Sequence, residues 1–149
     1  MNDAVDALMA TTRLLVGVAT RALEDLGMSL PQFRLLLVLD ELGASPGTVA
    51  AHRLGTAASS VTRLGDQLEA SGHLTRRRDP ANRSVVVLEP TEAGRALVGT
   101  VLARRREALA DLVGRLPDEQ RHALTAALTA LRDAAGPDLG VGPVELMTP

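Results

Sequence analysis

Apolar side chains recur every three or four residues along the first 26 positions, a spacing that places them on one face of an α-helix. Gly27 follows this stretch and is a typical helix stop. The pattern therefore predicts a first helix over residues 1–26. Its inner face is expected to hold Val5, Leu8, Met9, Thr12, Val16, Ala19, Leu23 and Leu26.

A second helix is predicted to begin at Ser29-Leu30-Pro31-Gln32. This stretch fits a capping box, in which the serine hydroxyl accepts a backbone N–H and the glutamine three positions later reaches back. Proline in the first turn costs no helical hydrogen bond. The helix should run to Leu42, and its apolar side is expected to hold Leu35, Leu36, Leu39 and Leu42.

Shorter segments follow and are separated by turn-forming residues. The stretch 43–47 predicts a turn, and 48–54 predicts a helix of about two turns before a glycine. Thr56 or Ser59 is expected to open another helix that runs through Glu69 and stops at a Ser-Gly pair. The inner side of that helix is expected to hold Val61, Leu64 and Leu68.

The periodicity then changes from helical to extended. Segments 73–78 and 84–89 flank Asp79-Pro80-Ala81-Asn82, a cluster of turn formers, and the run 85–88 is strongly β-favouring. These features predict a β-hairpin. The remaining expected elements are a long helix from Pro90-Thr91 to about Leu116, a helix from Pro117 to Gly136-Pro137, and a Gly- and Pro-rich tail over 138–149.

Composition excludes several kinds of chemistry. The 149 residues include no lysine, cysteine, tryptophan or tyrosine, and all 16 basic side chains are arginines. A lysine Schiff base, a phosphate-binding loop with lysine, a disulfide and a thiolate zinc site are therefore excluded. His52, His73 and His122 have no ligand partners at metal spacing apart from a loose Asp118/His122 pair. No metal, cofactor or enzymatic activity is expected.

Charge and hydropathy point to a soluble protein with a local anionic partner. No apolar run approaches the roughly 18 residues of a membrane helix, so a cytoplasmic location and no membrane association are expected. Between Arg53 and Arg83 six arginines face three acidic residues, which gives +3, although the whole chain carries −2. Such a basic middle favours binding to a polyanion.

The predicted order of elements is typical of a winged helix-turn-helix, because a short helix, a glycine turn, a second helix and a hairpin follow one another. The resemblance to the MarR family of bacterial transcriptional regulators runs from about Ser29 to Leu97. Four stretches carry it: Ala50-Ala51-His52-Arg53-Leu54-Gly55, Ser59-Ser60-Val61-Thr62-Arg63-Leu64, the Asp66, Leu68-Glu69 and Gly72 positions, and Thr91-Glu92-Ala93-Gly94.

The expected fold is therefore mainly α with a small β-hairpin wing, in a single domain over 1–149. Residues 29–97 would form the winged helix-turn-helix DNA-binding region. Residues 1–28 and 98–149 would form the helical dimerisation region, since their apolar stripes exceed what a small reading head needs. The resemblance implies a two-fold homodimer, which would read a pseudo-palindromic operator in double-stranded DNA.

Two positions depart from the family pattern. The family commonly shows Asp-x-Arg at the wing tip, whereas here Asn82 and Ser84 stand on either side of Arg83. Ala57 occupies a position where a capping serine is usual. Both departures concern contacts to DNA rather than the fold.

The candidate DNA-binding residues lie on the predicted recognition helix and around the wing. The alternatives are that Ser59 or Ser60 merely caps the helix, and that Arg63 pairs with Asp66 on a solvated face. Of the three arginines on the first strand, at most two can point the same way. The full candidate set is Ser59, Ser60, Thr62, Arg63, Arg53, Arg76, Arg77, Arg78 and Arg83.

The resemblance also implies release of DNA by a small, often aromatic or phenolic anion bound between the dimer helices and the reading head. Arg105 lies close to the apolar seam of its helix and is the candidate ligand-binding residue, although such arginines more often extend to water. Phe33 is the only aromatic side chain available to such a pocket.

The sequence thus predicts a sequence-specific DNA-binding regulator of transcription. The competing hypothesis is a dimeric ligand-binding or protein-interaction module of the same fold that has lost specific DNA readout. The altered wing tip and the modest local charge keep that alternative open.

Overall fold

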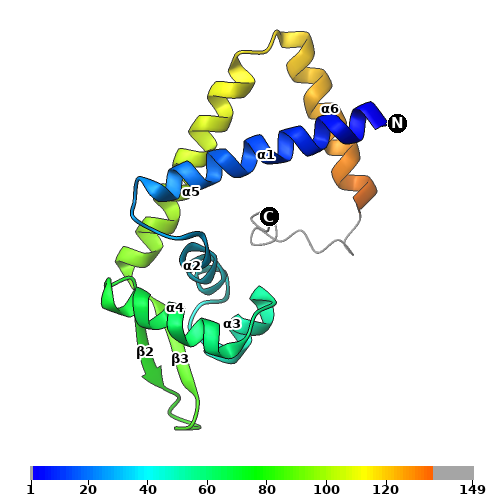
Figure 1. Cartoon of the computed structure of the whole chain (residues 1–149). Coiled ribbons are helices and arrows are strands. Elements are labelled where there is room, and N and C mark those ends of the chain that lie inside the picture. The colour runs from blue at the N-terminus through cyan, green and yellow to red at the C-terminus, as the bar shows by residue number, and fades with distance from the viewer. Residues whose placement is uncertain (1, 136–149) are drawn as a thin grey trace.

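The computed structural model describes residues 2–135, so the expectations for Met1, for the Gly136-Pro137 helix stop and for the tail lie outside the described residues. Six helices and a three-stranded antiparallel sheet make up the fold of this part of the chain (Figure 1). The elements are α1 (Asn2–Glu24), α2 (Leu30–Leu42), β1 (Ser45–Pro46), α3 (Gly47–Leu54), α4 (Ala58–Ala70), β2 (Leu74–Arg78), β3 (Val86–Pro90), α5 (Glu92–Gly114) and α6 (Asp118–Ala135).

The connection between α1 and α2 follows the predicted signals. Gly27 has φ +63°, and its N–H donates to the Glu24 carbonyl while the Met28 N–H donates to the Leu23 carbonyl. This pair of bonds closes the end of a helix around a left-handed residue, which glycine adopts at low cost. Ser29 and Gln32 then form the expected capping box at the start of α2.

Helix α2 is the centre of the core rather than a surface helix with one apolar side. Leu35 through Leu39 and Phe33 are all buried, because α3, α4, α5 and β3 pack around α2. Leu42 was expected on the apolar side, but it is 41% exposed. The expectation was wrong at this position because the whole last turn of α2, Asp40 to Leu42, is exposed. Phe33 lies fully inside this core.

Helix α4, the predicted recognition helix, begins at a different residue from the one expected. Ala57, rather than Thr56 or Ser59, is the N-cap of α4, and within the described chain no side chain caps this end. Val61, Leu64 and Leu68 face inward as expected. Packing of this apolar face against the core stabilises α4. The helix can therefore begin at a residue that has no capping hydroxyl.

The wing is a three-stranded sheet in the order β1-β3-β2, so the expected hairpin is present with one additional strand. Residues 43–47 were expected to form only a turn, yet Ser45 pairs with Leu88 and Pro46 with Val87. This pairing buries Ser45 and fixes the base of the wing against α3. A two-residue strand has no periodicity, so its pairing partner could not be read from the local pattern.

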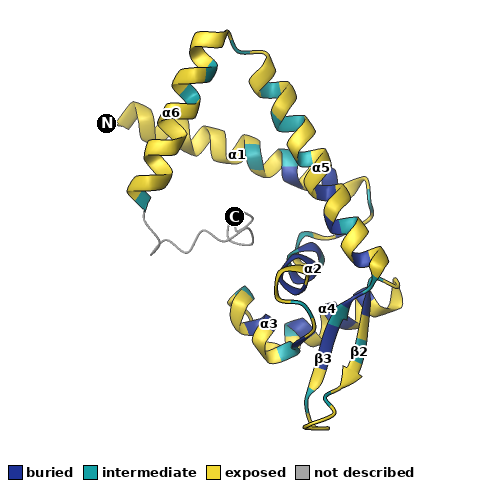
Figure 2. Cartoon of the chain, turned by 180° about the vertical axis from the view of Figure 1, so that it is seen from behind, coloured by how far each residue is buried: buried dark blue, intermediate teal, exposed yellow. Residues whose placement is uncertain are grey.

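The terminal helices extend away from this compact head. Helix α1 crosses α5, and α6 folds back from the far end of α5 (Figure 1). Buried residues gather where α1 and α5 meet the head, while the rest of α1, α5 and α6 is mostly exposed (Figure 2). No helix within residues 2–135 combines the length and apolar character required to cross a membrane.

Candidate nucleic-acid interface

The outer face of α4 presents hydroxyl and guanidinium groups to solvent. Ser59, Thr62 and Arg63 are exposed, and Ser60 is half-buried. Neither serine caps the helix, because the N-cap is Ala57. Across residues 2–135 Arg63 forms no ion pair, since Asp66 pairs with Arg76 instead. Arg63 therefore keeps its donors available for an external acceptor.

Arg76 on β2, a predicted DNA-binding residue, is engaged by side-chain and backbone groups of α4. Its Nη1 donates to Asp66 Oδ1 at 2.6 Å, and its Nη2 donates to the Thr62 carbonyl at 2.7 Å. Its Nε lies 3.7 Å from Glu69 Oε2, and the side chain is only 22% exposed. The guanidinium thus joins the wing to successive turns of the recognition helix, so Arg76 has few donors left for phosphate.

Gly65 makes room for this arrangement. A Cβ atom at Gly65 would lie 2.5 Å from Arg76 Nη2, well inside van der Waals contact. The absence of a side chain therefore lets the guanidinium lie directly on the helix backbone. Sequence reasoning did not assign Gly65 a role, because a glycine inside a helix shows its purpose only when the neighbouring strand is in place.

The other strand and tip arginines differ in how they are engaged. Arg77 lies 3.7 Å from Glu89 and remains half-exposed. Arg78 Nη1 donates to the Arg83 carbonyl at 2.6 Å, which ties the strand to the tip loop. The Arg83 side chain is exposed. Arg77 and Arg78 are successive residues of β2, opposite Val87 and Val86. Successive side chains of a strand alternate, so the two arginine side chains lie on opposite faces of the sheet.

The wing tip is held by local side-chain bonds. Asp79 Oδ1 accepts the Ala81 N–H at 2.8 Å, and Asn82 Oδ1 accepts the Ser84 N–H at 3.1 Å. Asn82 therefore shapes the turn around Arg83 through the backbone. Such Asx turns order short polar loops. The altered tip is thus an ordered loop that presents one arginine.

Two further arginines lie on the helices that pack against α4, and only Arg53 was among the predicted site residues. Arg53 on α3 lies 3.8 Å from Glu41 and is 48% exposed. Arg34 on α2 lines a hollow beside α4 together with Ser60 and Arg63. The one available signal for Arg34 was a single charged residue in the first turns of an otherwise apolar helix.

The predicted ligand residue lies outside this surface. Arg105 is half-buried on α5 and lines an open hollow of about 460 Å³ whose other walls are Leu102, Arg106, Leu109, Ala110 and Val113. Asp118 and His122 were the one pair at a spacing near that of metal ligands, and Asp118 forms an ion pair with Arg121. Among the described residues no three His, Cys, Asp or Glu side chains gather as a metal site requires.

A short helix, a left-handed glycine, an exposed second helix and a cation-bearing wing together define a winged helix-turn-helix protein. Comparison with known proteins gives the family. Residues 26–83 match the MarR family. The chain is 28% identical over 109 residues to YfiV of Bacillus subtilis, an uncharacterized HTH-type transcriptional regulator, in an alignment that covers 73% of this chain and 68% of YfiV.

Solved structures agree over most of the chain. RV1404 from Mycobacterium tuberculosis superposes with a TM-score of 0.81 at 31% identity, and the match covers 91% of this chain and 94% of that protein. A point mutant of MepR from S. aureus, solved bound to an oligodeoxyribonucleotide, shares the fold with a TM-score of 0.73 at 20% identity over 90% and 97% of the two chains. The chain belongs to the MarR family and is an HTH-type transcriptional regulator.

Proposed function

We propose that this regulator binds double-stranded DNA sequence-specifically as a homodimer on a pseudo-palindromic operator. The observation that carries the proposal is the outer face of α4, where Arg63 has no ion-pair partner within residues 2–135. Exposed hydroxyls on Ser59 and Thr62 lie on the same face. A helix of this kind fits the major groove, and arginine contacts guanine edges there.

The wing is proposed to supply the contacts that fix the orientation of the protein on the DNA duplex. Arg83 at the exposed tip is proposed to reach the minor groove or its phosphates. Arg77 and Arg78 are proposed to contact the phosphate backbone of the DNA. Arg53 is proposed to contact a phosphate from α3. Ser60, which is half-buried, is proposed to lie at the edge of the contact surface. Arg76 supports the reading helix in this proposal, because its donors are engaged by α4.

The homodimer part of the proposal is supported by the terminal helices. Across the described residues α6 buries none of its side chains, and Leu128 and Leu131 are 52% and 48% exposed. Leu8 and Met9 on α1 are 44% and 58% exposed. Monomeric proteins rarely expose so many large apolar side chains to water. A second copy of the chain is therefore expected to pack against these helices. Residues 1–28 and 98–149 would then form the dimerisation region.

A small anionic effector is proposed to modulate DNA binding. The supporting observation is the open hollow at Arg105 and Arg106, which adjoins the apolar side of α5. A ligand there would act only if it favoured a dimer conformation with a different spacing of the two recognition helices. The protein is proposed to work in the cytoplasm, in the same compartment as its operator.

The proposal is tested by binding to the protein's own upstream promoter and to a shuffled duplex across a salt series. We expect a preference of about 10³ or more for the promoter and a steep fall of log K with log salt. Arg63→Ala should reduce the preference by about 5- to 150-fold, because a base contact carries about 1–3 kcal/mol.

Arg115→Ala is the matched control, because Arg115 is exposed and directly follows the last residue of α5. The turn between α5 and α6 lies far from the wing (Figure 1). Equal and weak binding to both duplexes, persisting across genomic fragments and candidate ligands, would refute specific readout. The protein would then be a ligand-binding or interaction module with the same fold.

A further inference from the structure

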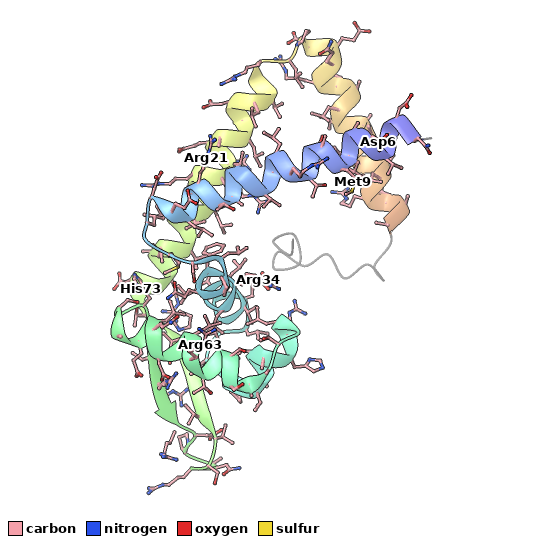
Figure 3. The ribbon with its side chains drawn as sticks, viewed as in Figure 1. Asp6, Met9, Arg21, Arg34, Arg63 and His73 are labelled. Carbon is pink, nitrogen blue, oxygen red and sulfur yellow. The ribbon has the colours of Figure 1, made fainter. Side chains whose placement is uncertain are left out.

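A hollow of about 270 Å³ lies between α2 and the start of α4. Its polar lining consists of Arg34, Thr56, Ser60 and Arg63, and proline and leucine side chains complete it. A single water occupies about 30 Å³, so the hollow has room for a larger group with its own waters. Figure 3 shows that Arg34 comes from α2 and Arg63 from α4.

The lining carries two positive charges and no acidic side chain. Arg34 Nε is buried and has no hydrogen-bond partner anywhere in residues 2–135. Neither Arg34 nor Arg63 forms an ion pair within that same range, whereas Arg53, Arg76 and Arg77 all do. The guanidinium of Arg34 therefore finds no acceptor within the described residues, and an acceptor that enters the hollow would supply one to the part of the group that lines it.

The start of α4 adds to this preference. Ala57 occupies the N-cap and offers no side-chain acceptor to the first backbone N–H groups of a 13-residue helix. The unpaired N–H groups at a helix start carry partial positive charge. Two guanidiniums, two hydroxyls and this helix start therefore surround a space that an oxyanion would neutralise.

We propose that this hollow holds a phosphate of the DNA backbone and that Arg34 is a further DNA-contacting residue. The proposal rests on the proposed DNA-binding function, because the hollow opens beside Ser60 and Arg63 on the reading face. The planar guanidinium of arginine binds phosphate oxygens in pairs. In the DNA complex Arg63 leaves the hollow to contact a base, and Arg34 holds the phosphate from α2. One phosphate thereby fixes the entry angle of α4.

The experiment measures promoter and shuffled-duplex binding of Arg34→Gln, Arg34→Lys and Arg115→Gln across a salt series. Each lost phosphate contact reduces the slope of log K against log salt by about 0.9. We expect a reduction of this size for Arg34→Gln on both duplexes, with an unchanged preference for the promoter. Arg34→Lys should retain most of the slope, because the charge remains. Arg115→Gln should match the wild type.

A second arm distinguishes DNA phosphate from free phosphate. Inorganic phosphate is titrated against DNA-free wild type and Arg34→Gln, and thermal unfolding is followed. A phosphate-dependent stabilisation that needs Arg34, together with an unchanged DNA salt slope, would overturn the DNA assignment in favour of a free anion. An unchanged slope with no phosphate effect would overturn the site itself.

This arm also separates the two proposals from each other. A wild-type protein without specific DNA binding would refute the proposed function, yet the phosphate titration would still report on the hollow. Thermal unfolding without phosphate verifies that each variant is folded. A lower thermal stability of Arg34→Gln and Arg34→Lys with unchanged salt slopes would assign Arg34 to packing and overturn the contact.

Discussion

Arg76 shows how one side chain sets the geometry between the wing and helix α4. Its guanidinium bonds to Asp66 and to the Thr62 carbonyl while it lies over Gly65. Bonds to charged groups contribute more than neutral ones, and this guanidinium is mostly shielded from solvent. The wing and the recognition helix therefore cannot move independently without breaking these contacts.

Arg76→Met should lower the free energy of unfolding by about 1–3 kcal/mol, because it removes charge-assisted bonds that α4 does not replace. Arg77→Met is the matched control, since Arg77 is half-exposed and its ion pair spans 3.7 Å. Exposed pairs of this kind contribute about 0–1 kcal/mol. Urea unfolding of both variants measures the difference. Equal losses in the two variants would contradict a positioning role for Arg76.

At the scale of the element, the two helices that flank the wing begin in contrasting ways. Thr91 caps α5, since its hydroxyl accepts the Gly94 N–H and donates to the Gly72 carbonyl. Gly94 is required there, because a Cβ would lie 2.2 Å from the His73 carbonyl oxygen. The recognition helix has no such cap, since Ala57 has an extended backbone and a methyl side chain. The start of α4 is thus less stabilised than the start of α5.

Ala57→Ser should raise the free energy of unfolding by about 0.5–2 kcal/mol, because the backbone of Ala57 already has the extended conformation of an N-cap. Ala58→Ser adds the same hydroxyl one position later, inside the helix, and serves as the control. Thermal or urea unfolding measures both. A gain shared by the two variants would mean that capping is not its cause.

At the scale of the whole molecule, the division between a compact head and extended terminal helices is the dominant feature (Figure 2). The core holds the C-terminal end of α1 and the N-terminal half of α5 together with α2, α3, α4 and the sheet. The rest of α1 and α5, and the whole of α6, expose leucine and valine side chains to solvent. The single chain therefore buries the apolar pattern of the head and leaves that of the terminal helices uncovered.

Leu128→Glu should convert the proposed dimer to a monomer, because a charge would replace an apolar side chain at the interface. Leu128 is 52% exposed in the single chain, so the substitution leaves the fold of the chain intact. Val49→Glu, at a 46% exposed position on α3, is the control with the same change of charge. Light scattering measures the mass. A mass unchanged by Leu128→Glu would contradict an interface at α6.

The local pattern by itself determined most of the elements of this protein. Periodic apolar residues, a capping box and turn glycines act within a few residues, so the six helices and the two longer strands of the described chain were predictable from neighbours in sequence. The exposed positions of Ser59, Thr62 and Arg63 followed from the same periodicity, because Val61 and Leu64 had to face inward.

Contacts between distant segments were decided only by the tertiary structure. The pairing of β1 with β3, the seating of Arg76 on Gly65 and the burial of Leu35 through Leu39 depend on segments that lie far apart along the chain. The same holds for the hollow that joins Arg34 to Arg63. Local periodicity shows which way a side chain points from its own element, whereas the partner that it meets depends on how the elements pack.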